Sequence, residues 1–398
     1  MPLIIPTPEQ ADRLKRVNSG LAEYKKMGSA KDLVAASVAA LQDDPFRVKF
    51  AASRVGKPPL AGPKDLMDVL WAYLYYHLYR RDYVSAAFVL WGSETFTPEP
   101  WCVQLMFDAL FKERMIAIIG GGGLGKTYVP TAWILMDWML DPEWTRIQIA
   151  SNTEDHLMRN LYADLVRLHG EAALPLPGQV DAESVSLNKK RGMGIFVLTI
   201  PGGPQSAGKI KGAHTKARPE HPIFGTRSRT VMLIDEAQEV AQNIFSEIPN
   251  RFSTVGPGDI EHIKFIITAN PKDPYSPFGQ TLKPKNGWQS ISIADRTWRS
   301  EKGWWVVSLN AMEHENVVAR KEIYKGFVTY EGTQNWLNDS SGDPEHPSMY
   351  TYVYGKFPPQ GTTRAVVAAN DLRKSEREWI FDGPTENYAF ADWAFTGD

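Results

Sequence analysis

Apolar and polar positions divide the chain into a helical first part and a later part of alternating strands and helices. Residues 1 to about 92 are predicted to be helical. The run Thr7-Pro8-Glu9-Gln10 has the cap hydroxyl, early proline and later glutamine of a capping box, so it predicts a helix start. Residues 64–91 are rich in Trp, Tyr and Phe, which favours a core or a subunit interface over an aromatic ligand-binding box.

Five short apolar runs follow, and each is predicted to be a buried strand. They are residues 115–119, 146–150, 195–200, 231–234 and 263–268. Helices are predicted over 127–140, from a cap at 151–154 to about 168, and over 317–327. Strands that alternate with helices predict an α/β fold, in which a mostly parallel sheet carries helices on both faces.

A glycine-rich loop follows the first of these strands. Gly120-Gly121-Gly122-Gly123-Leu124-Gly125-Lys126-Thr127 fits the Walker A pattern G-x-x-x-x-G-K-[ST] of P-loop NTPases. Glycines let the backbone wrap around phosphates, and the helix that follows presents its positive end to them. Lys126 is expected to reach the β- and γ-phosphates, and the Thr127 hydroxyl to ligate Mg²⁺. The loop therefore predicts binding of ATP with Mg²⁺.

The apolar run at 231–234 ends in two carboxylates, Asp235 and Glu236, which is a Walker B pattern. Asp235 is expected to hold Mg²⁺ through a water molecule, and Glu236 to deprotonate the attacking water. Adjacent carboxylates repel each other without a cation, so metal binding should be coupled to nucleotide binding. The next strand leads to Asn270, whose amide is predicted to sense the γ-phosphate, with a turn or cap asparagine as the alternative.

Composition and charge limit the class of protein and its location. The chain has 398 residues, of which 43% are hydrophobic and 23% charged, as in an ordinary globular protein. A single cysteine, Cys102, excludes an intramolecular disulfide and fits a reducing, intracellular location. No apolar run is long enough to span a bilayer, and no secretion signal is recognised. Residues 189–229 carry nine basic side chains and one acidic one, which predicts either a polyanion contact or a solvated basic loop.

Taken in this order, the three elements resemble the large terminase subunit of tailed bacteriophages, the ATPase that pumps DNA into capsids. The resemblance covers roughly residues 93–398. Residues 268–270 look like the coupling motif of that family. Residues 96–104 look like its adenine-recognition segment, which implies that Trp101 and Gln104 bind the base. Two further segments, 206–212 and 354–358, are similar to family segments before the acidic strand and at the end of the ATPase region.

The resemblance also implies a division of the chain. Residues 1–92 would form a helical N-terminal region, 93–275 the ATPase core, 276–378 a lid or linker subdomain, and 379–398 the start of an RNase H-like nuclease. Phe390-Ala391-Asp392 is similar to the first metal-binding strand of that nuclease, so Asp392 would be one ligand of an incomplete metal site. Two-metal cleavage needs several carboxylates, so we expect this chain to hydrolyse ATP without cutting DNA. The full-length protein would also be an endonuclease.

An arginine is expected to stabilise the transferring phosphate. The family often has one inside the phosphate loop, where this chain has glycines. A neighbouring subunit can supply such an arginine finger instead. The candidates are Arg227 and Arg229, then Arg218, with Arg159 as a weaker one.

The resemblance implies several partners and a location. They are double-stranded DNA, contacted non-specifically through its phosphates, the portal protein and capsid, the small terminase subunit, and copies of the chain in a ring, expected to be a pentamer. The location would be the host cytoplasm. Two other functions are considered. A helicase-type translocase would need a second RecA-like lobe, for which the sequence after Asn270 shows no pattern. A nucleotide-binding scaffold without turnover would not need Glu236.

Overall fold

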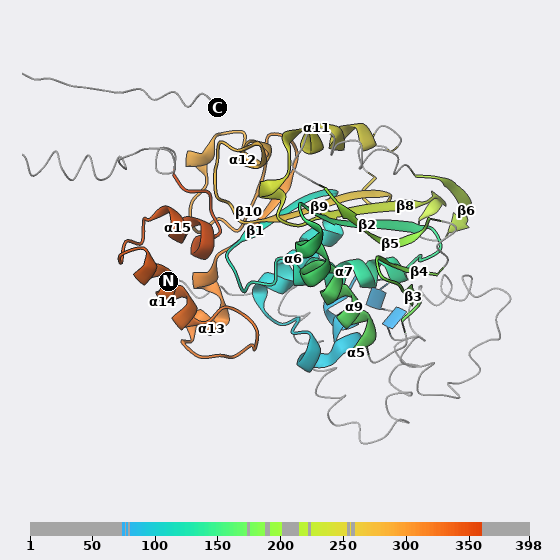
Figure 1. Cartoon of the computed structure of the whole chain (residues 1–398), viewed down its shortest axis with the longest axis horizontal. Helices are drawn as coiled ribbons and strands as arrows, with labels where there is room; N and C mark the ends of the chain where they lie inside the picture. The colour runs from blue at the N-terminus through green and yellow to red at the C-terminus, as the bar shows by residue number, and fades with distance from the viewer. Residues whose placement is uncertain are drawn as a thin grey trace, which may run out of the picture. The chain divides into compact units, whose positions relative to one another are not determined.

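A computed structural model describes residues 74–359, apart from 76, 79, 173–175, 188–191, 201–214, 222–223, 253–254 and 256–258 (Figure 1). The described residues up to Pro358 belong to one compact unit. The capping box at 7–10, the segment 206–212 and Asp392 lie outside the described residues. Within the described part, no helix combines the length and apolar character that a bilayer span requires.

One central sheet contains nine strands. They are β1 (Met115–Gly120), β2 (Thr145–Ser151), β3 (Gln179–Val180), β4 (Ser184–Ser186), β5 (Gly194–Thr199), β8 (Arg229–Ile234), β9 (Ile263–Ala269), β10 (Thr297–Arg299) and β11 (Trp305–Leu309). Their order is β10-β11-β1-β9-β8-β2-β5-β4-β3. The six strands from β11 to β5 are parallel, whereas the strands at both edges are antiparallel. The predicted α/β class with a mostly parallel sheet is confirmed, and so are all five predicted strands.

Helices cover both faces of this sheet (Figure 1). One face carries α5 (Tyr83–Thr95), α6 (Trp101–Lys112), α7 (Tyr128–Met139) and α9 (Ala163–Gly170), and the other carries α11 (Gln242–Arg251) and α12 (Pro277–Leu282). Successive residues of β1 alternate between the two cores, because side chains of a strand point to opposite faces. Ile116 and Ile118 lie in one core, and Ala117 and Ile119 in the other.

The boundaries predicted at 92 and 275 both lie inside the compact unit that extends to Pro358. The boundary at 92 falls within α5, at Gly92, whose φ of 60° kinks the helix. The hydroxyl of Tyr83 in α5 donates to Asp137 in α7 at 2.9 Å, so this helix is part of the core that also holds the phosphate-loop helix. The sheet continues past the boundary at 275, because β11 pairs with β1. A separate hairpin is formed by β6 (Ala217–His221) and β7 (Gly225–Arg227).

The segment after β11 consists of short helices. They are η6 (Ala311–Glu313), α13 (Glu315–Val318), α14 (Tyr330–Asp339), α15 (Pro347–Met349) and the π-helical turn η7 (Tyr350–Tyr354). The helix predicted over 317–327 is wrong. Helix α13 ends at Val318, and the chain then turns through positive φ angles at Arg320 (49°) and Gly326 (79°). Helix α14, which begins after the cap residue Thr329, is not among the predicted helices.

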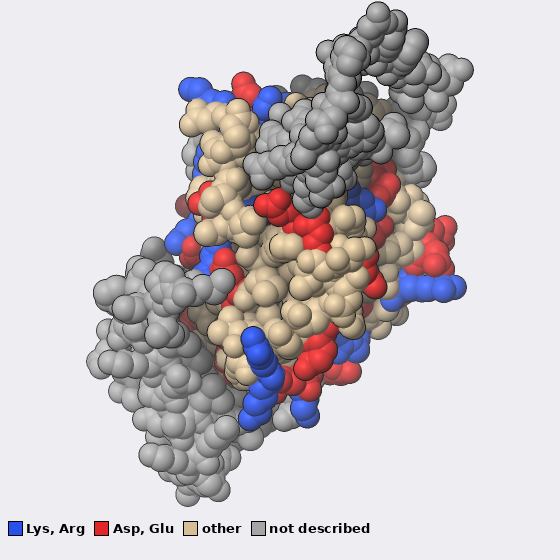
Figure 2. Space-filling model, turned by 90° about the vertical axis from the view of Figure 1, so that its left-hand side faces the viewer, with Lys and Arg blue, Asp and Glu red and all other residues tan. Residues whose placement is uncertain are grey.

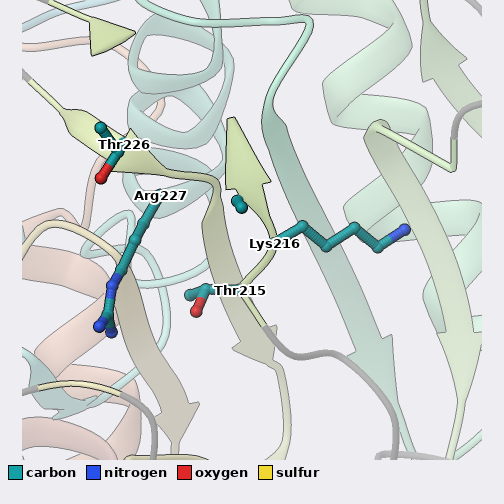
Figure 3. A pocket seen from close by; sticks show the side chains of 5 residues that line it. Thr215, Lys216, Thr226 and Arg227 are labelled. Carbon is teal, nitrogen blue, oxygen red and sulfur yellow. The ribbon is translucent and has the colours of Figure 1, made fainter. Parts of the chain in front are cut away.

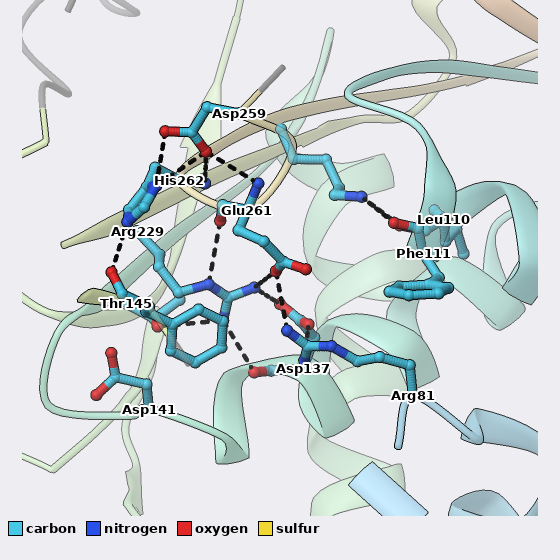
Figure 4. A network of polar contacts seen from close by, with 12 residues as sticks. Arg81, Leu110, Phe111, Asp137, Asp141, Thr145, Arg229, Asp259, Glu261 and His262 are labelled. Atoms are coloured by element: carbon cyan, nitrogen blue, oxygen red, sulfur yellow. Dashed lines mark hydrogen bonds and ion pairs between the residues drawn. The ribbon is translucent and has the colours of Figure 1, made fainter. Parts of the chain in front are cut away.

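A buried network of charges fixes the starting end of β8 (Figure 4). Arg229 is 1% exposed and donates to the Asp137 carboxylate at 2.5 Å. Arg81, which precedes α5, lies 3.6 Å from the same carboxylate and donates to Glu261 at 2.9 Å. Removing one partner from a buried ion pair costs about 3–5 kcal/mol, because the other charge is left unpaired. The network therefore ties α5, α7 and β8 together at the end of the sheet away from Asp235.

Candidate nucleotide-binding site

The phosphate loop and the acidic pair meet at one edge of the sheet. Strand β9 lies between β1 and β8, and all three strands are parallel, so their carboxyl ends share an edge. The loop after β1, Asp235 and Glu236 after β8, and Asn270 after β9 therefore converge. Ligands of open α/β sheets bind at such an edge.

The phosphate loop leads from β1 into the first turn of α7. Gly123 and Gly125 both have a backbone φ of 72°, a conformation that residues with a Cβ rarely adopt. The Lys126 ammonium group donates to the carbonyl of Gly121 at 3.2 Å, so the lysine folds back over its own loop. Burial lowers the pKa of Lys126, although the nearby carboxylates of Asp235 and Glu236 oppose this shift. A partly desolvated ammonium group is suited to binding phosphate oxygens.

The Thr127 hydroxyl and the Asp235 carboxylate form the candidate metal site. Thr127 Oγ1 donates to Asp235 Oδ1 at 3.1 Å. Thr268 of β9 also donates to Oδ1, and His156 Nε2 lies 3.0 Å from Oδ2. Burial alone would raise the pKa of Asp235, but the hydrogen bonds from His156, Thr268 and Thr127 bring it below the ordinary value. Asp235 is therefore an ionised carboxylate whose two oxygens are both held in place.

Hydroxyl and carboxylate oxygens are suitable ligands for Mg²⁺. Among the described residues, no group of three or more His, Cys, Asp or Glu side chains could hold a metal ion. Magnesium in nucleotide sites is usually held by one or two protein oxygens together with phosphates and waters, so a sparse set fits it. The residues present therefore fit Mg²⁺ bound with a nucleotide better than a metal bound by protein alone.

Glu236 has an unusual backbone conformation. Its φ of 52° and ψ of 43° are left-handed, which is strained for a residue with a Cβ. Such strain costs of order 1–3 kcal/mol and occurs preferentially at active sites. The turn directs the Glu236 carboxylate out of the strand, where its side chain is 37% exposed and its Oε1 lies 3.9 Å from His156 Nε2. An accessible carboxylate beside the metal ligand is where a base for water activation would stand.

Asn270 presents an unpaired acceptor near this edge. Its backbone N–H donates to the Gln238 side chain at 3.3 Å, while its side-chain Oδ1 is buried without a hydrogen-bond partner among the described atoms. A buried polar atom without a partner costs free energy, so a donor that arrives with the ligand would be favoured there. The next residue, Pro271, accepts a hydrogen bond from Thr351 of η7 at 3.1 Å. Asn270 is thus one residue from a direct contact with the last part of the described chain.

The same C-terminal part lies against the phosphate loop. A Cβ built on Gly121 would come within 1.9 Å of the carbonyl oxygen of Tyr352, so only glycine fits there. The N–H of Val328 donates to the carbonyl of Gly123 at 2.8 Å. The glycines of this loop therefore serve close backbone packing as well as phosphate binding.

The hydrogen bonds of the Trp101 and Gln104 side chains go to residues outside the phosphate loop. The Trp101 indole donates to the Glu313 carbonyl at 2.9 Å, and the Arg296 guanidinium lies 4.2 Å from the centre of its ring. The Gln104 amide donates to the Glu99 carbonyl at 2.7 Å. The role of Trp101 and Gln104 in binding adenine stays a prediction.

The structure separates the four candidate arginines. Arg229, one of the two first candidates for the arginine finger, is contradicted by the structure, because it is buried in the Asp137 network, roughly 20 Å along β8 from Asp235. Arg218 is paired with Asp141, and its side chain is only 6% exposed. Arg227 is exposed on β7, and Arg159 is exposed just after α8 (Glu154–His156), where it pairs with Asp155 at 2.7 Å. Of the four, Arg227 and Arg159 keep accessible side chains.

A hollow beside the β6–β7 hairpin contains Arg227 (Figure 3). Its lining residues are Thr215, Lys216, Ala217, Thr226 and Arg227. The Lys216 and Arg227 side chains point away from each other, so they do not form one cationic pocket. Of the nine basic residues between 189 and 229, these are two that the structure describes as exposed.

His156 is a site residue that no sequence motif predicts. It ends the short helix α8, which follows β2, the neighbour of β8 in the sheet. Its imidazole contacts Asp235, and this hydrogen bond raises the pKa of His156. The only signal in the sequence is position: a polar residue shortly after a strand that pairs with the acidic strand.

No protein-family model and no curated protein matches the sequence. Several solved structures are similar to the chain at low identity. The large terminase of a thermophilic bacteriophage, in complex with ADP, aligns at 14% identity and a TM-score of 0.38 over 66% of this chain. That alignment covers 52% of the phage protein, so this chain spans about half of its length.

Two shorter proteins align over nearly their whole length. A variant of the large terminase ATPase domain from a Thermus phage has 13% identity and a TM-score of 0.40, covering 67% of this chain and 97% of its own. The N-terminal domain of the DNA packaging ATPase from bacteriophage phi29 has 12% identity and a TM-score of 0.33, covering 55% and 98%. At this distance, conclusions about function depend on the chemistry of the site itself.

The packing of the phosphate loop leads to a first prediction. We expect Gly121→Ala to lower the free energy of unfolding by roughly 1–3 kcal/mol, because the new methyl group overlaps the Tyr352 carbonyl. Gly122→Ala is the control, since a Cβ there meets nothing within 4 Å and the change should stay within about 0.5 kcal/mol. Urea denaturation of the nucleotide-free protein measures both. Equal stability of the two variants would contradict the close approach of Tyr352.

Proposed function

We propose that the chain is an ATP-hydrolysing motor subunit of the large terminase type, which converts ATP to ADP and phosphate. The observation that carries the proposal is the 3.1 Å contact between Thr127 at the end of the Walker A loop and Asp235 after β8. That contact joins the two motifs that P-loop ATPases use to hold Mg²⁺ with the nucleotide. Neither motif alone would distinguish an ATPase from a glycine turn or an acidic strand end.

Each residue of the site has a part in this reaction. The loop amides and Lys126 bind the phosphates. Thr127 and Asp235 would hold Mg²⁺, which neutralises phosphate charge when bound. Glu236 takes a proton from the attacking water. The unpaired Oδ1 of Asn270 accepts a hydrogen bond from this water, which orients the water before the reaction and is lost once the water has reacted. The link from Pro271 to Thr351 supports transmission of that change to the segment after β11.

Translocation of double-stranded viral DNA into a capsid is the finer part of the proposal. It is supported by the resemblance in the order of motifs, and it implies the portal protein, capsid and small terminase subunit as partners of a ring of copies. On the face in Figure 2, described Lys and Arg side chains are interspersed with Asp and Glu. That mixed pattern favours DNA contact at another surface, and the exposed Lys216, which directly precedes β6, is a candidate.

The helicase alternative is disfavoured by the topology of the described residues. After Asn270, β10 and β11 join the edge of the first sheet instead of starting a second one. A nucleotide-binding scaffold is disfavoured by the accessible Glu236 carboxylate beside the site of Asp235, since a protein without turnover would not need a base there.

Hydrolysis is tested most directly at Glu236. We expect Glu236→Gln to slow single-turnover ATP hydrolysis by about 10²–10⁴-fold while ATP still binds, because the amide cannot accept the proton of the water. Glu239→Gln is the matched control, since Glu239 lies three residues on and pairs with Lys272 at 3.1 Å. An unchanged rate in Glu236→Gln would show that another group is the base.

The arginine finger is tested by mixing two variants. We propose that Arg227 acts on the site of a neighbouring copy, because it is exposed and lies at the end of the sheet away from its own carboxylates. Arg227→Ala should lose about 10³–10⁵-fold in turnover under assembling conditions, and Lys126→Ala should be inactive. A mixture of the two should regain activity, since each lacks what the other supplies. No recovery on mixing would contradict action across a subunit interface.

The DNA contact is tested by its dependence on salt. If Lys216 binds one phosphate, Lys216→Gln should reduce the slope of log affinity against log salt for duplex DNA by about 0.9. Lys112→Gln is the control, because Lys112 is exposed on α6 but pairs with Asp108 at 2.9 Å. Binding to duplex DNA that does not change with salt, or no binding at low salt, would count against a packaging role.

A further inference from the structure

His156 lies beside Asp235 because the strand that precedes it, β2, pairs with β8. Strand β2 pairs with β8 up to Ala150 and Ile234, and the Asp235 N–H donates to the Ala150 carbonyl at 2.8 Å. The segment after β2 therefore runs beside Asp235. The Thr153 side chain caps α8 by accepting a hydrogen bond from the His156 N–H at 3.3 Å, which fixes where the imidazole starts.

Both nitrogens of the His156 ring have partners. Asn160 Nδ2 lies 2.9 Å from Nδ1, and Asp235 Oδ2 lies 3.0 Å from Nε2. If the Asn160 amide donates to Nδ1, the proton of the neutral ring is on Nε2, which then donates to Asp235. Asn160 thus fixes the ring through Nδ1, and the ring in turn donates from Nε2 to the Asp235 carboxylate.

The hydrogen bonds divide the two oxygens of Asp235 between two tasks. Oδ1 faces Thr127, where the metal is expected, and Thr268 supports it from β9. Oδ2 is held by His156. A carboxylate can rotate about its Cβ–Cγ bond, so a hydrogen bond to Oδ2 adds to the hold of Thr268 on the metal-facing oxygen and fixes the plane of the carboxylate.

We propose that His156 is a positioning residue, which anchors Oδ2 of Asp235 and so keeps Oδ1 directed at the magnesium site beside Thr127. This inference rests on the proposed ATPase function and deepens it. The role needs only an N–H donor at the place of Nε2, and it needs no change in protonation of the ring. It assigns to the segment after β2 a part in metal binding that none of the sequence motifs carries.

The imidazole can be removed without losing the helix that bears it. Leu157 and Leu161, on the same helical segment, are 1% and 0% exposed and anchor it to the core. The His156 side chain itself is 24% exposed, so substitution leaves no large cavity. A variant at this position should therefore remain folded, which thermal unfolding can verify.

The test compares metal binding in three proteins: the wild type, His156→Phe and His156→Gln. Phe keeps a flat ring but has no N–H, whereas Gln keeps an N–H donor and cannot titrate. Mn²⁺ replaces Mg²⁺, and its binding to the full chain is followed by electron paramagnetic resonance with a non-hydrolysable ATP analogue present. We expect His156→Phe to weaken Mn²⁺ binding by about 10–100-fold, and His156→Gln to restore most of it. Analogue binding without metal should be the same in all three.

The outcomes separate this inference from the proposed function. A wild-type chain that shows no nucleotide-dependent Mn²⁺ binding would overturn the ATPase proposal itself. Wild-type binding with an unaffected His156→Phe variant would overturn only the role of His156. Equal losses of Mn²⁺ binding in His156→Phe and His156→Gln would also overturn it. That result would mean that the site needs the imidazole itself, as a titrating group or a metal ligand, and not only an N–H donor. Asn160→Ala should give a smaller loss in the same direction as His156→Phe.

Discussion

The parallel pairing of β1, β9 and β8 is the constraint on which the candidate site depends. The pairs Ile119 with Ala269, and Ile234 with Ile267, bring the three strand ends into line. This alignment alone brings together the residues that follow the three strands. The pairing is maintained by the two apolar cores, where burying each Ile or Val side chain contributes about 1.5–3 kcal/mol. The geometry around Asp235 is therefore stabilised largely by hydrophobic contacts that never touch a nucleotide.

Charged side chains are buried in ion pairs at one end of the sheet, whereas at the other end they belong to the candidate site. At the starting end of β8, Arg229 and Arg81 are neutralised by Asp137 and Glu261 in a buried network that serves packing. At the other end, Asp235 is surrounded by hydrogen-bond donors, and Glu236 remains accessible. Paired charges at the first end hold the layers together, while the carboxylates at the second are available to a ligand that brings its own cation.

The sequence predicts the elements whose signal is local. Short apolar runs identify β1, β2, β5, β8 and β9, and the Walker patterns identify the loop and the acidic pair. The missed features depend on partners far along the chain. Arg229 and Asp137 are 92 residues apart, and His156 and Asp235 are 79 apart, so nothing near either residue in the sequence reveals the contact. The wrong helix at 317–327 has apolar spacing, but positive φ angles at Arg320 and Gly326 end the helical path. Net charge is similarly misleading, because Arg218 and Arg229 contribute to the basic stretch and yet are buried in ion pairs.

The five-residue turn η7 contacts both the phosphate loop and the residue that follows Asn270. The Tyr352 carbonyl packs on Gly121 of the phosphate loop, so closely that a Cβ on Gly121 would overlap it. The Thr351 hydroxyl binds the Pro271 carbonyl, next to the asparagine expected to respond to the γ-phosphate. If Asn270 responds to the γ-phosphate as proposed, loss of that phosphate would reach η7 through Pro271, while the contact between Tyr352 and Gly121 stays. The turn would then shift against the loop on which it packs, and the loss of one phosphate would become a change of shape.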